Sequence, residues 1–177
     1  GTGPVEVLPG GRLTFINNNT ETNLVILNGG EIATATGNPY ATLPLILIKG
    51  TGTISSKSPN YFHLTGSIAD YDASTPGQLI IRNESAGPLT LVTSDKHYSG
   101  GTHIQRGLLV TPRMPDAGMI RIDTNATLKL TTASEDTLGG LSGGGSLDLG
   151  TVAVTCAEGL RPGVEVLAGS TLCVTGS

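Results

Sequence analysis

The sequence predicts a single all-β domain, a parallel β-helix (β-solenoid) of about eight coils, on the basis of three observations. Similar segments recur along the 177-residue chain, apolar and polar residues alternate within them, and glycine-rich turns separate them. Repetition at a period of roughly 20 residues is the sequence signature of a solenoid. Since a solenoid is built first as a scaffold, a specific activity has to lie in whatever departs from the repeat.

The clearest internal repeat joins the two ends of the chain. Residues 5–13 read VEVLPGGRL, and residues 164–172 read VEVLAGSTL. In each copy a turn residue stands three places before an aliphatic residue of the next strand, as Gly10 stands before Leu13. Weaker copies, with the same spacing, are found at 27–32 (LNGGEI), 122–130 (IDTNATLKL) and 142–149 (SGGGSLDL).

Alternation with a period of two predicts the individual strands, because it puts apolar side chains on one face of an extended segment. No stretch keeps an apolar face at helical spacing, so no helix is expected. Short strands cannot bury a face alone, and stacking successive coils turns their inward aliphatic residues into ladders. The alternating pairs are Val5/Val7, Leu13/Phe15, Ile120/Ile122, Leu128/Leu130, Leu147/Leu149, Val152/Val154, Val164/Val166 and Leu172/Val174.

Two segments depart from this alternation and are predicted to project from the rod as loops. Residues 111–118 (TPRMPDAG) carry two prolines. Residues 56–77 (SKSPNYFHLTGSIADYDASTPG) form the possible ligand-contact loop, because aromatic residues on a groove suit glycan or protein binding. The alternative is that these rings cover the side of the rod. The candidate contact residues are Tyr61, Phe62, His63 and Tyr71.

Composition excludes two classes of partner. Charged residues make up 14% of the chain, the net charge is −4, and lysine and arginine are scattered. Nucleic-acid binding needs clustered positive charge, so no nucleic-acid partner is expected. The longest apolar run, LPLILI at 43–48, has the length of one buried strand, so membrane contact is expected only through an anchor domain outside this sequence. The lack of a signal peptide and of an initial Met fits a mature or excised fragment.

The two cysteines, Cys156 and Cys173, lie 17 residues apart, slightly less than one predicted coil. Stacked strands are about 4.8 Å apart, which is within disulfide reach, so a bridge could join the last two coils. The alternative is that both are small buried apolar residues.

No catalytic residue, cofactor or metal site is predicted. Asp70 and Asp72 could form a carboxylate pair or a calcium site, but one Asp-x-Asp supplies too few oxygens, and a solvated loop is the simpler interpretation. His97 and His103 flank a glycine turn and could share an edge with Asp95. No known catalytic motif accompanies them, so they are expected to be surface residues.

Residues 87–110 (GPLTLVTSDKHYSGGTHIQRGLLV) resemble the autotransporter-associated β-strand repeat, also called the passenger-associated transport repeat, of bacterial surface proteins. The usual form of that repeat is a G-x-L-T-L strand, a polar link, TYSGGT, a short strand and G-x-L-x-V. His97 stands where the family usually has threonine. The matching positions are Gly87, Leu89, Leu91, Tyr98, Ser99, Gly100, Gly101, Thr102, Ile104, Gly107, Leu108 and Val110.

The resemblance implies a right-handed parallel β-helix exported to the cell surface or the medium of a bacterium. We therefore expect a non-catalytic structural module: a stalk, a fibre or a passenger scaffold. One alternative is an adhesin that binds a glycan or a host surface through loop 56–77. A second is a polysaccharide-degrading enzyme, which would need acidic or basic side chains such as Asp70, Asp95 and Asp123 to converge in one groove.

The likeness of the first and last coils predicts end-to-end self-association, because an exposed sheet edge invites pairing with another chain. The final coil of one subunit would offer its edge to the first coil of the next. Negative-stain electron microscopy at high protein concentration is expected to show filaments. Dispersed monomers at every concentration would count against this assembly.

Overall fold

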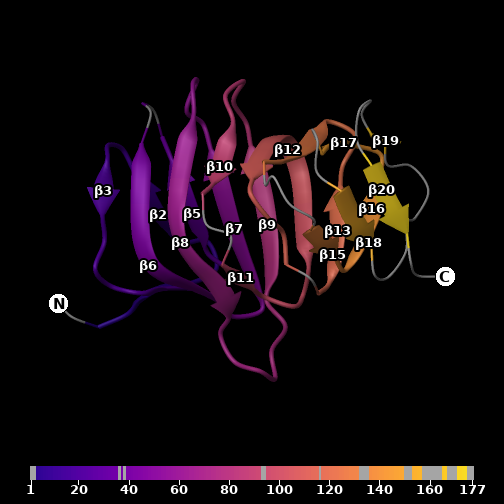
Figure 1. The fold of residues 1–177 in the computed structure, drawn as a ribbon. Coiled ribbons are helices and arrows are strands. Elements are labelled where there is room, and N and C mark those ends of the chain that lie inside the picture. The colour runs from indigo at the N-terminus through magenta and orange to yellow at the C-terminus, as the bar shows by residue number, and fades with distance from the viewer. Residues whose placement is uncertain are drawn as a thin grey trace.

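The computed structural model describes residues 3–35, 37, 39–92, 95–115, 117–131 and 136–149, and the backbone of 153–156, 165–166 and 171–174. Within these residues the chain forms strands and turns but no helix, and the strands stack in parallel as a β-solenoid (Figure 1). The predicted fold class is confirmed.

Each coil passes through three stacks of parallel strands, which we call sheets I, II and III. Sheet I pairs seven strands in order: β2 (Arg12–Phe15), β5 (Glu31–Thr34), β7 (Thr51–Ser56), β9 (Gln78–Asn83), the first part of β12 (Thr102–Thr111), β13 (Met119–Ile122) and β16 (Gly140–Gly143).

Sheet II follows sheet I in each coil. It pairs β3 (Asn19–Thr20), the first part of β6 (Tyr40–Ile48), the first part of β8 (Phe62–Asp70), β10 (Leu89–Leu91), the end of β12, β14 (Ala126–Leu130), β17 (Ser146–Asp148) and β19 (Glu165–Val166).

Sheet III completes the coil. It pairs β1 (Val5–Val7), β4 (Val25–Leu27), the ends of β6 and β8, and β11 (Lys96–His97). The long strands β6 and β8 therefore turn a corner from sheet II into sheet III, where their pairing register shifts. Beyond β14, a separate sheet of β15 (Asp136–Leu138), β18 (Ala153–Cys156) and β20 (Thr171–Val174) follows.

The solenoid has about six turns, fewer than the eight predicted. Partners in sheet I are 19, 22, 27, 23, 18 and 21 residues apart, following Leu13, Ile32, Ile54, Ile81, Ile104, Ile122 and Gly143. The longest coil contains the loop at 71–77 and a further turn at 84–88. These insertions lengthen the middle coils, so fewer turns are made for the same length of chain.

The core is a set of aliphatic ladders running along the axis. In sheet I, Ile32, Ile54, Ile81, Ile104 and Ile122 are direct register partners and are fully or almost fully buried. Each such side chain contributes about 1.5 to 3 kcal/mol by leaving water. A second ladder in sheet II consists of Leu89, Leu109, Leu128 and Leu147.

The prediction that residues 56–77 form one projecting loop is wrong. Residues Phe62–Asp70 are β8, a nine-residue strand that buries Phe62, Leu64 and Ile68. Gly66, at the corner between sheets II and III, interrupts the alternation that would have revealed the strand. Only the short turn before β8 and the loop 71–77 after it lie outside the ladder, and this loop extends beyond the body of the solenoid (Figure 1).

The predicted loop at 111–118 also differs from expectation. Thr111 is the last residue of β12, and Met114 and Pro115 are buried. The described residues of this segment thus fold against the solenoid where other coils carry a strand of sheet III. The two prolines explain the missing strand, since proline cannot donate a ladder hydrogen bond.

Glycine is required where one coil approaches the next in a left-handed backbone conformation. Gly107 has a φ of +76°, and a Cβ there would lie 2.2 Å from the backbone oxygen of Asn83 in the adjacent coil. Gly50 has the same φ of +76°, but nothing lies within 4 Å of its would-be Cβ. The two positions therefore separate backbone strain from coil contact.

We expect Gly50→Ala to destabilise the domain by about 1 to 2 kcal/mol, the cost of a left-handed non-glycine residue. Gly107→Ala should cost about 1 to 3 kcal/mol more, because the methyl group also pushes two coils apart. Urea denaturation followed by circular dichroism measures both. Equal midpoints for the two variants would show that the contact with Asn83 has no energetic weight.

Candidate functional site

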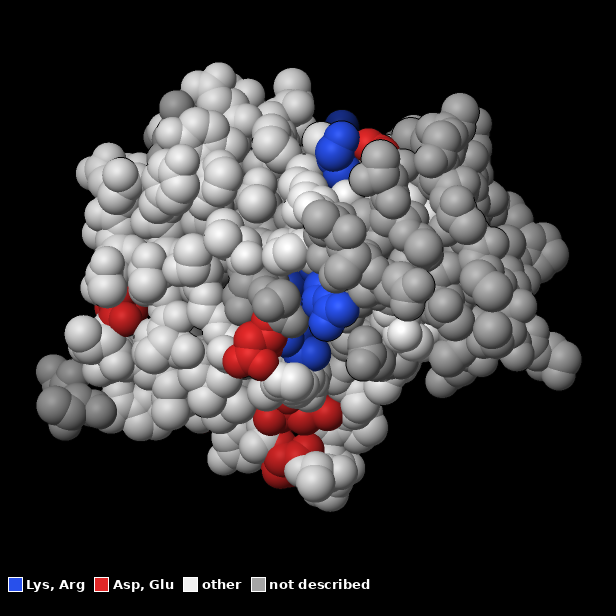
Figure 2. Space-filling model, in the orientation of Figure 1, with Lys and Arg blue, Asp and Glu red and all other residues white. Residues whose placement is uncertain are grey.

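Most of the side chains able to do chemistry gather where β8 ends beside β11. On the face seen in Figure 2, acidic side chains collect below the centre of the molecule, close to a few basic ones. A hollow of about 310 Å³ opens in this region. It is lined by Lys96, His97, Tyr98, Ser99, Arg113, Met114, Pro115 and Ala117. The motif residues singled out in the sequence are therefore part of the candidate site.

Tyr98 is a core residue of this region. Its side chain is 1% exposed, and its hydroxyl lies 2.7 Å from the Thr102 hydroxyl. Burial raises the pKa of Tyr98, so its phenol stays protonated at physiological pH. Gly101, between them, has a φ of +86° and leaves no room for a Cβ beside the backbone of Met119. The Tyr-Ser-Gly-Gly-Thr motif thus forms a tight, internally bonded turn.

Asp70 fastens this turn to the loop that follows β8. Its carboxylate accepts hydrogen bonds from the backbone N–H of Gly77 at 2.6 Å and from the Ser99 hydroxyl at 2.7 Å. The backbone N–H of Ser99 donates to both carboxylate oxygens, at 3.2 and 3.1 Å. Asp70 thereby holds together segments from two successive coils.

Asp72 has a separate, local role. It accepts hydrogen bonds from the Ser74 backbone at 2.9 Å and the Ser74 hydroxyl at 2.6 Å, and these bonds lower the pKa of Asp72. Asp70 and Asp72 therefore serve different turns. Among the described residues, no group of three or more His, Cys, Asp or Glu side chains could hold a metal ion.

Ser67, Asp95 and His97 form a hydrogen-bonded group on sheet III. The Ser67 hydroxyl donates to one oxygen of Asp95, and the Nε2 atom of His97 contacts the other. A hydrolytic triad needs the histidine between serine and acid, so that it can take the proton of the serine. Here the carboxylate stands in the middle, and His97 is 73% exposed. This order holds a carboxylate in place but does not activate a serine.

His103 lies on a different sheet from His97, so the two histidines that flank the turn do not share an edge. His103 is on β12 in sheet I, and its Nε2 atom lies 2.9 Å from a carboxylate oxygen of Asp123 in the next coil. Arg121 donates to the other oxygen of Asp123 at 3.0 Å. On the preceding coil, Arg82 donates to Gln105 at 2.7 Å. Polar contacts thus run from coil to coil across sheet I.

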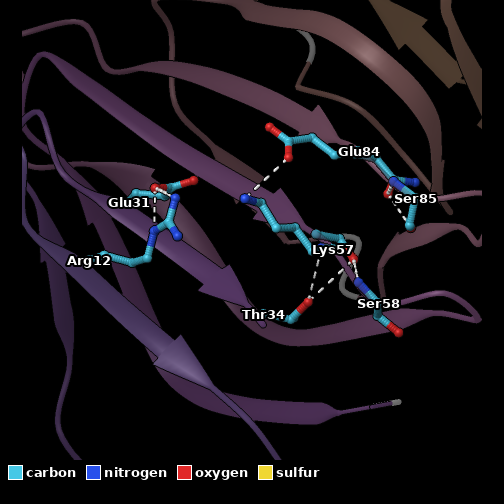
Figure 3. A network of polar contacts seen from close by, with 9 residues as sticks. Arg12, Glu31, Thr34, Lys57, Ser58, Glu84 and Ser85 are labelled. Carbon is cyan, nitrogen blue, oxygen red and sulfur yellow. Dashed lines mark hydrogen bonds and ion pairs between the residues drawn. The ribbon is translucent and has the colours of Figure 1, made fainter. Parts of the chain in front are cut away.

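Ion pairs repeat this pattern elsewhere on the solenoid. Figure 3 shows Arg12 pointing at Glu31, at 2.7 Å, and Lys57 pointing at Glu84, at 3.5 Å. Lys129 bonds Asp148 in the next coil at 2.9 Å. The first of these pairs lines a groove of about 490 Å³ on sheet I, together with Thr53, Ile80 and Arg82. Each pair joins neighbouring coils.

The residues predicted to contact a ligand are divided among three places. Phe62 is in the core, with 0% exposure, so it cannot contact a ligand. Tyr61 and His63 contact Tyr40 of the preceding coil. Tyr71 lies under the Lys49 ammonium, which is 5.1 Å from its ring centre.

The cysteines fall in the part of the chain whose side chains the structure does not describe. The backbone register pairs Cys156 with Val174 and Cys173 with Thr155, so they are offset by one position. The disulfide stays a prediction.

Sequence reasoning missed Tyr40 and Ser67 as members of these clusters. Tyr40 meets His63, 23 residues later, and Ser67 meets Asp95, 28 residues later. Coil lengths fix both contacts. A correct assignment of β8 would have revealed the first, since it places His63 beside Tyr40 in the register.

Comparison of the chain with protein-family models, curated proteins and solved structures gives no significant match. The described residues include no helix long and apolar enough to cross a membrane. The function must therefore be argued from the geometry above.

The hydrogen bond from Ser67, followed by the contact with His97, lowers the pKa of Asp95. We expect the carboxyl 13C shift of Asp95 to titrate below about 3.9, the ordinary aspartate value. Its contribution to stability is present above that pH and is lost as the pH falls through the lowered folded-state pKa.

Ser67→Ala should raise the pKa of Asp95 toward its ordinary value and leave Asp72, whose pKa depends on Ser74, unchanged. The same NMR titration of both variants and wild type measures this. An unchanged Asp95 midpoint in Ser67→Ala would refute the assigned hydrogen bond.

Proposed function

We propose that this chain is a non-catalytic structural module of an exported bacterial surface protein, acting as a stalk, fibre or passenger scaffold. The observation that carries the proposal is the use made of its polar side chains. Those best able to do chemistry are bonded to neighbouring coils, as in Arg12–Glu31, Ser67–Asp95, Asp70–Ser99 and His103–Asp123.

These contacts suit a load-bearing rod. Every coil hydrogen-bonds its neighbours through the backbone, and the aliphatic ladders add burial along the whole axis. Exposed ion pairs add about 0 to 1 kcal/mol each, so they set the alignment of coils more than the total stability. A rod built this way offers few unpaired segments to a protease, which an extracellular scaffold requires.

The resemblance to the autotransporter-associated repeat supports the same role. The positions that carry it are used for building coils: Tyr98 and Thr102 are buried and bonded to each other, and Gly101 and Gly107 allow close approach of neighbouring coils. A repeat whose distinctive residues all serve packing is typical of a structural module.

The enzyme alternative has less support. It needs Asp70, Asp95 and Asp123 to converge on one substrate. Asp123 is bonded to His103 and Arg121 on sheet I, whereas Asp70 and Asp95 are bonded to Ser99 and Ser67 beside sheet III. Each carboxylate holds a different pair of segments in place.

Proteinase K added to intact cells of the source bacterium tests the exported location. An antibody raised against this domain should detect loss or shortening of the parent protein, because an external protease reaches any protein displayed on the surface. A cytosolic marker should stay intact. Complete protection of the parent protein until the cells are lysed would overturn the proposed location.

A further inference from the structure

Three rings meet on the outer face of sheet II, in a chain with only six aromatic residues. The ring centres of Tyr40 and His63 are 4.5 Å apart, with the planes inclined by 22°. Tyr61 approaches both edge-on, at 5.4 and 4.8 Å. The rings thus form an L-shaped cluster, two nearly parallel and one steeply inclined.

The position of this cluster is not explained by the core. The other aromatic side chains are Phe15, Phe62 and Tyr98, which are buried, and Tyr71, which contacts Lys49. Tyr40 is 45% exposed, although it projects from a sheet whose inward face is filled by aliphatic residues. Exposed aromatic groups gathered in one place mark binding surfaces more often than scattered ones do.

The surroundings of the rings are polar but uncharged. The outward row of sheet II that contains Tyr40 and His63 continues through Thr90 and Val110. The row beside it contains Thr20, Thr42 and Thr65. At the upper end, the amide oxygen of Asn18 accepts a hydrogen bond from the backbone of Tyr40, which places this amide next to the rings.

The rings themselves carry no charge near neutral pH. Partial burial lowers the pKa of His63, which leaves the imidazole neutral. Partial burial and the neighbouring Tyr40 hydroxyl raise the pKa of Tyr61, which keeps the phenol protonated. An ionic ligand would find no opposite charge along these two rows.

We propose that Tyr40, Tyr61 and His63 form a binding site for a neutral glycan. A sugar ring has a face of C–H groups that packs on an aromatic ring, and hydroxyls at its edge that bond to amides and hydroxyls. The cluster supplies the rings, and Asn18, Thr42 and Thr65 supply polar groups beside them. A protein partner is less favoured, because a stable interface needs about 800 Å² per partner with large apolar anchors.

Isothermal titration calorimetry tests the site with four neutral hexasaccharides: maltohexaose, cellohexaose, laminarihexaose and N-acetylchitohexaose. Hexagalacturonate serves as the acidic counterpart. At least one neutral sugar should bind, and hexagalacturonate should bind more weakly. Tyr40→Ala and Tyr61→Ala should each weaken binding about tenfold or more, the effect expected of a central aromatic contact.

Two variants provide matched controls. Tyr71→Ala removes an exposed tyrosine outside the cluster and should change the affinity by less than about twofold. Tyr40→Phe keeps the ring without its hydroxyl and should retain most of the binding. Circular dichroism melts identify any variant that fails to fold, and Tyr40→Phe then still tests the site by its retained binding.

Several results would overturn the proposal: no binding of any neutral hexasaccharide, tighter binding of hexagalacturonate, or equal losses in Tyr71→Ala and Tyr40→Ala. If no sugar binds but Tyr40→Ala abolishes self-association in sedimentation equilibrium, the cluster is a protein interface and the glycan proposal is wrong. None of these results bears on export or on the scaffold role, which the protease experiment tests separately.

Discussion

Hydrogen bonding between successive coils is the constraint on which the rest of this structure depends. Parallel strands need a long connection between partners, and here each connection is simply one turn of the solenoid. Register partners therefore come from residues about 20 positions apart, as Val5 and Val25 do. Any insertion in a coil has to leave the ladder as a loop, because the strands on either side must still meet their partners.

This constraint divides residues into two kinds. Inward positions repeat the same apolar type, since each must fill the space above its partner, as the isoleucine ladder of sheet I does. Corners accept what the bend demands: Gly66 and Gly107 have positive φ values and lie against the backbone of an adjacent coil. The buried side chain of Asn83 donates to the backbone oxygens of Gly87 and Leu108, so a polar corner is satisfied inside the core.

The same geometry organises the outer surface. Because outward side chains are also stacked at the coil spacing, opposite charges in neighbouring coils become ion pairs and like rings become clusters. Lys129 thus meets Asp148, and Tyr40 meets His63. A solenoid surface is in this sense a set of rows, and each row has a chemical character of its own. The charged rows align coils, whereas the uncharged row with three rings is suited to a neutral ligand.

The sequence by itself determined the class of fold, because period-two alternation, glycine turns and a repeat near 20 residues are properties of the chain that need no partner. It also determined that Tyr98 to Thr102 form a distinctive turn. Only the tertiary structure decided that Phe62–Asp70 are a strand, how many turns are made, and which side chains meet across coils. The physical reason is that these contacts depend on the length of each coil: adding or removing one residue shifts every partner by one position, and with it the face to which each side chain points.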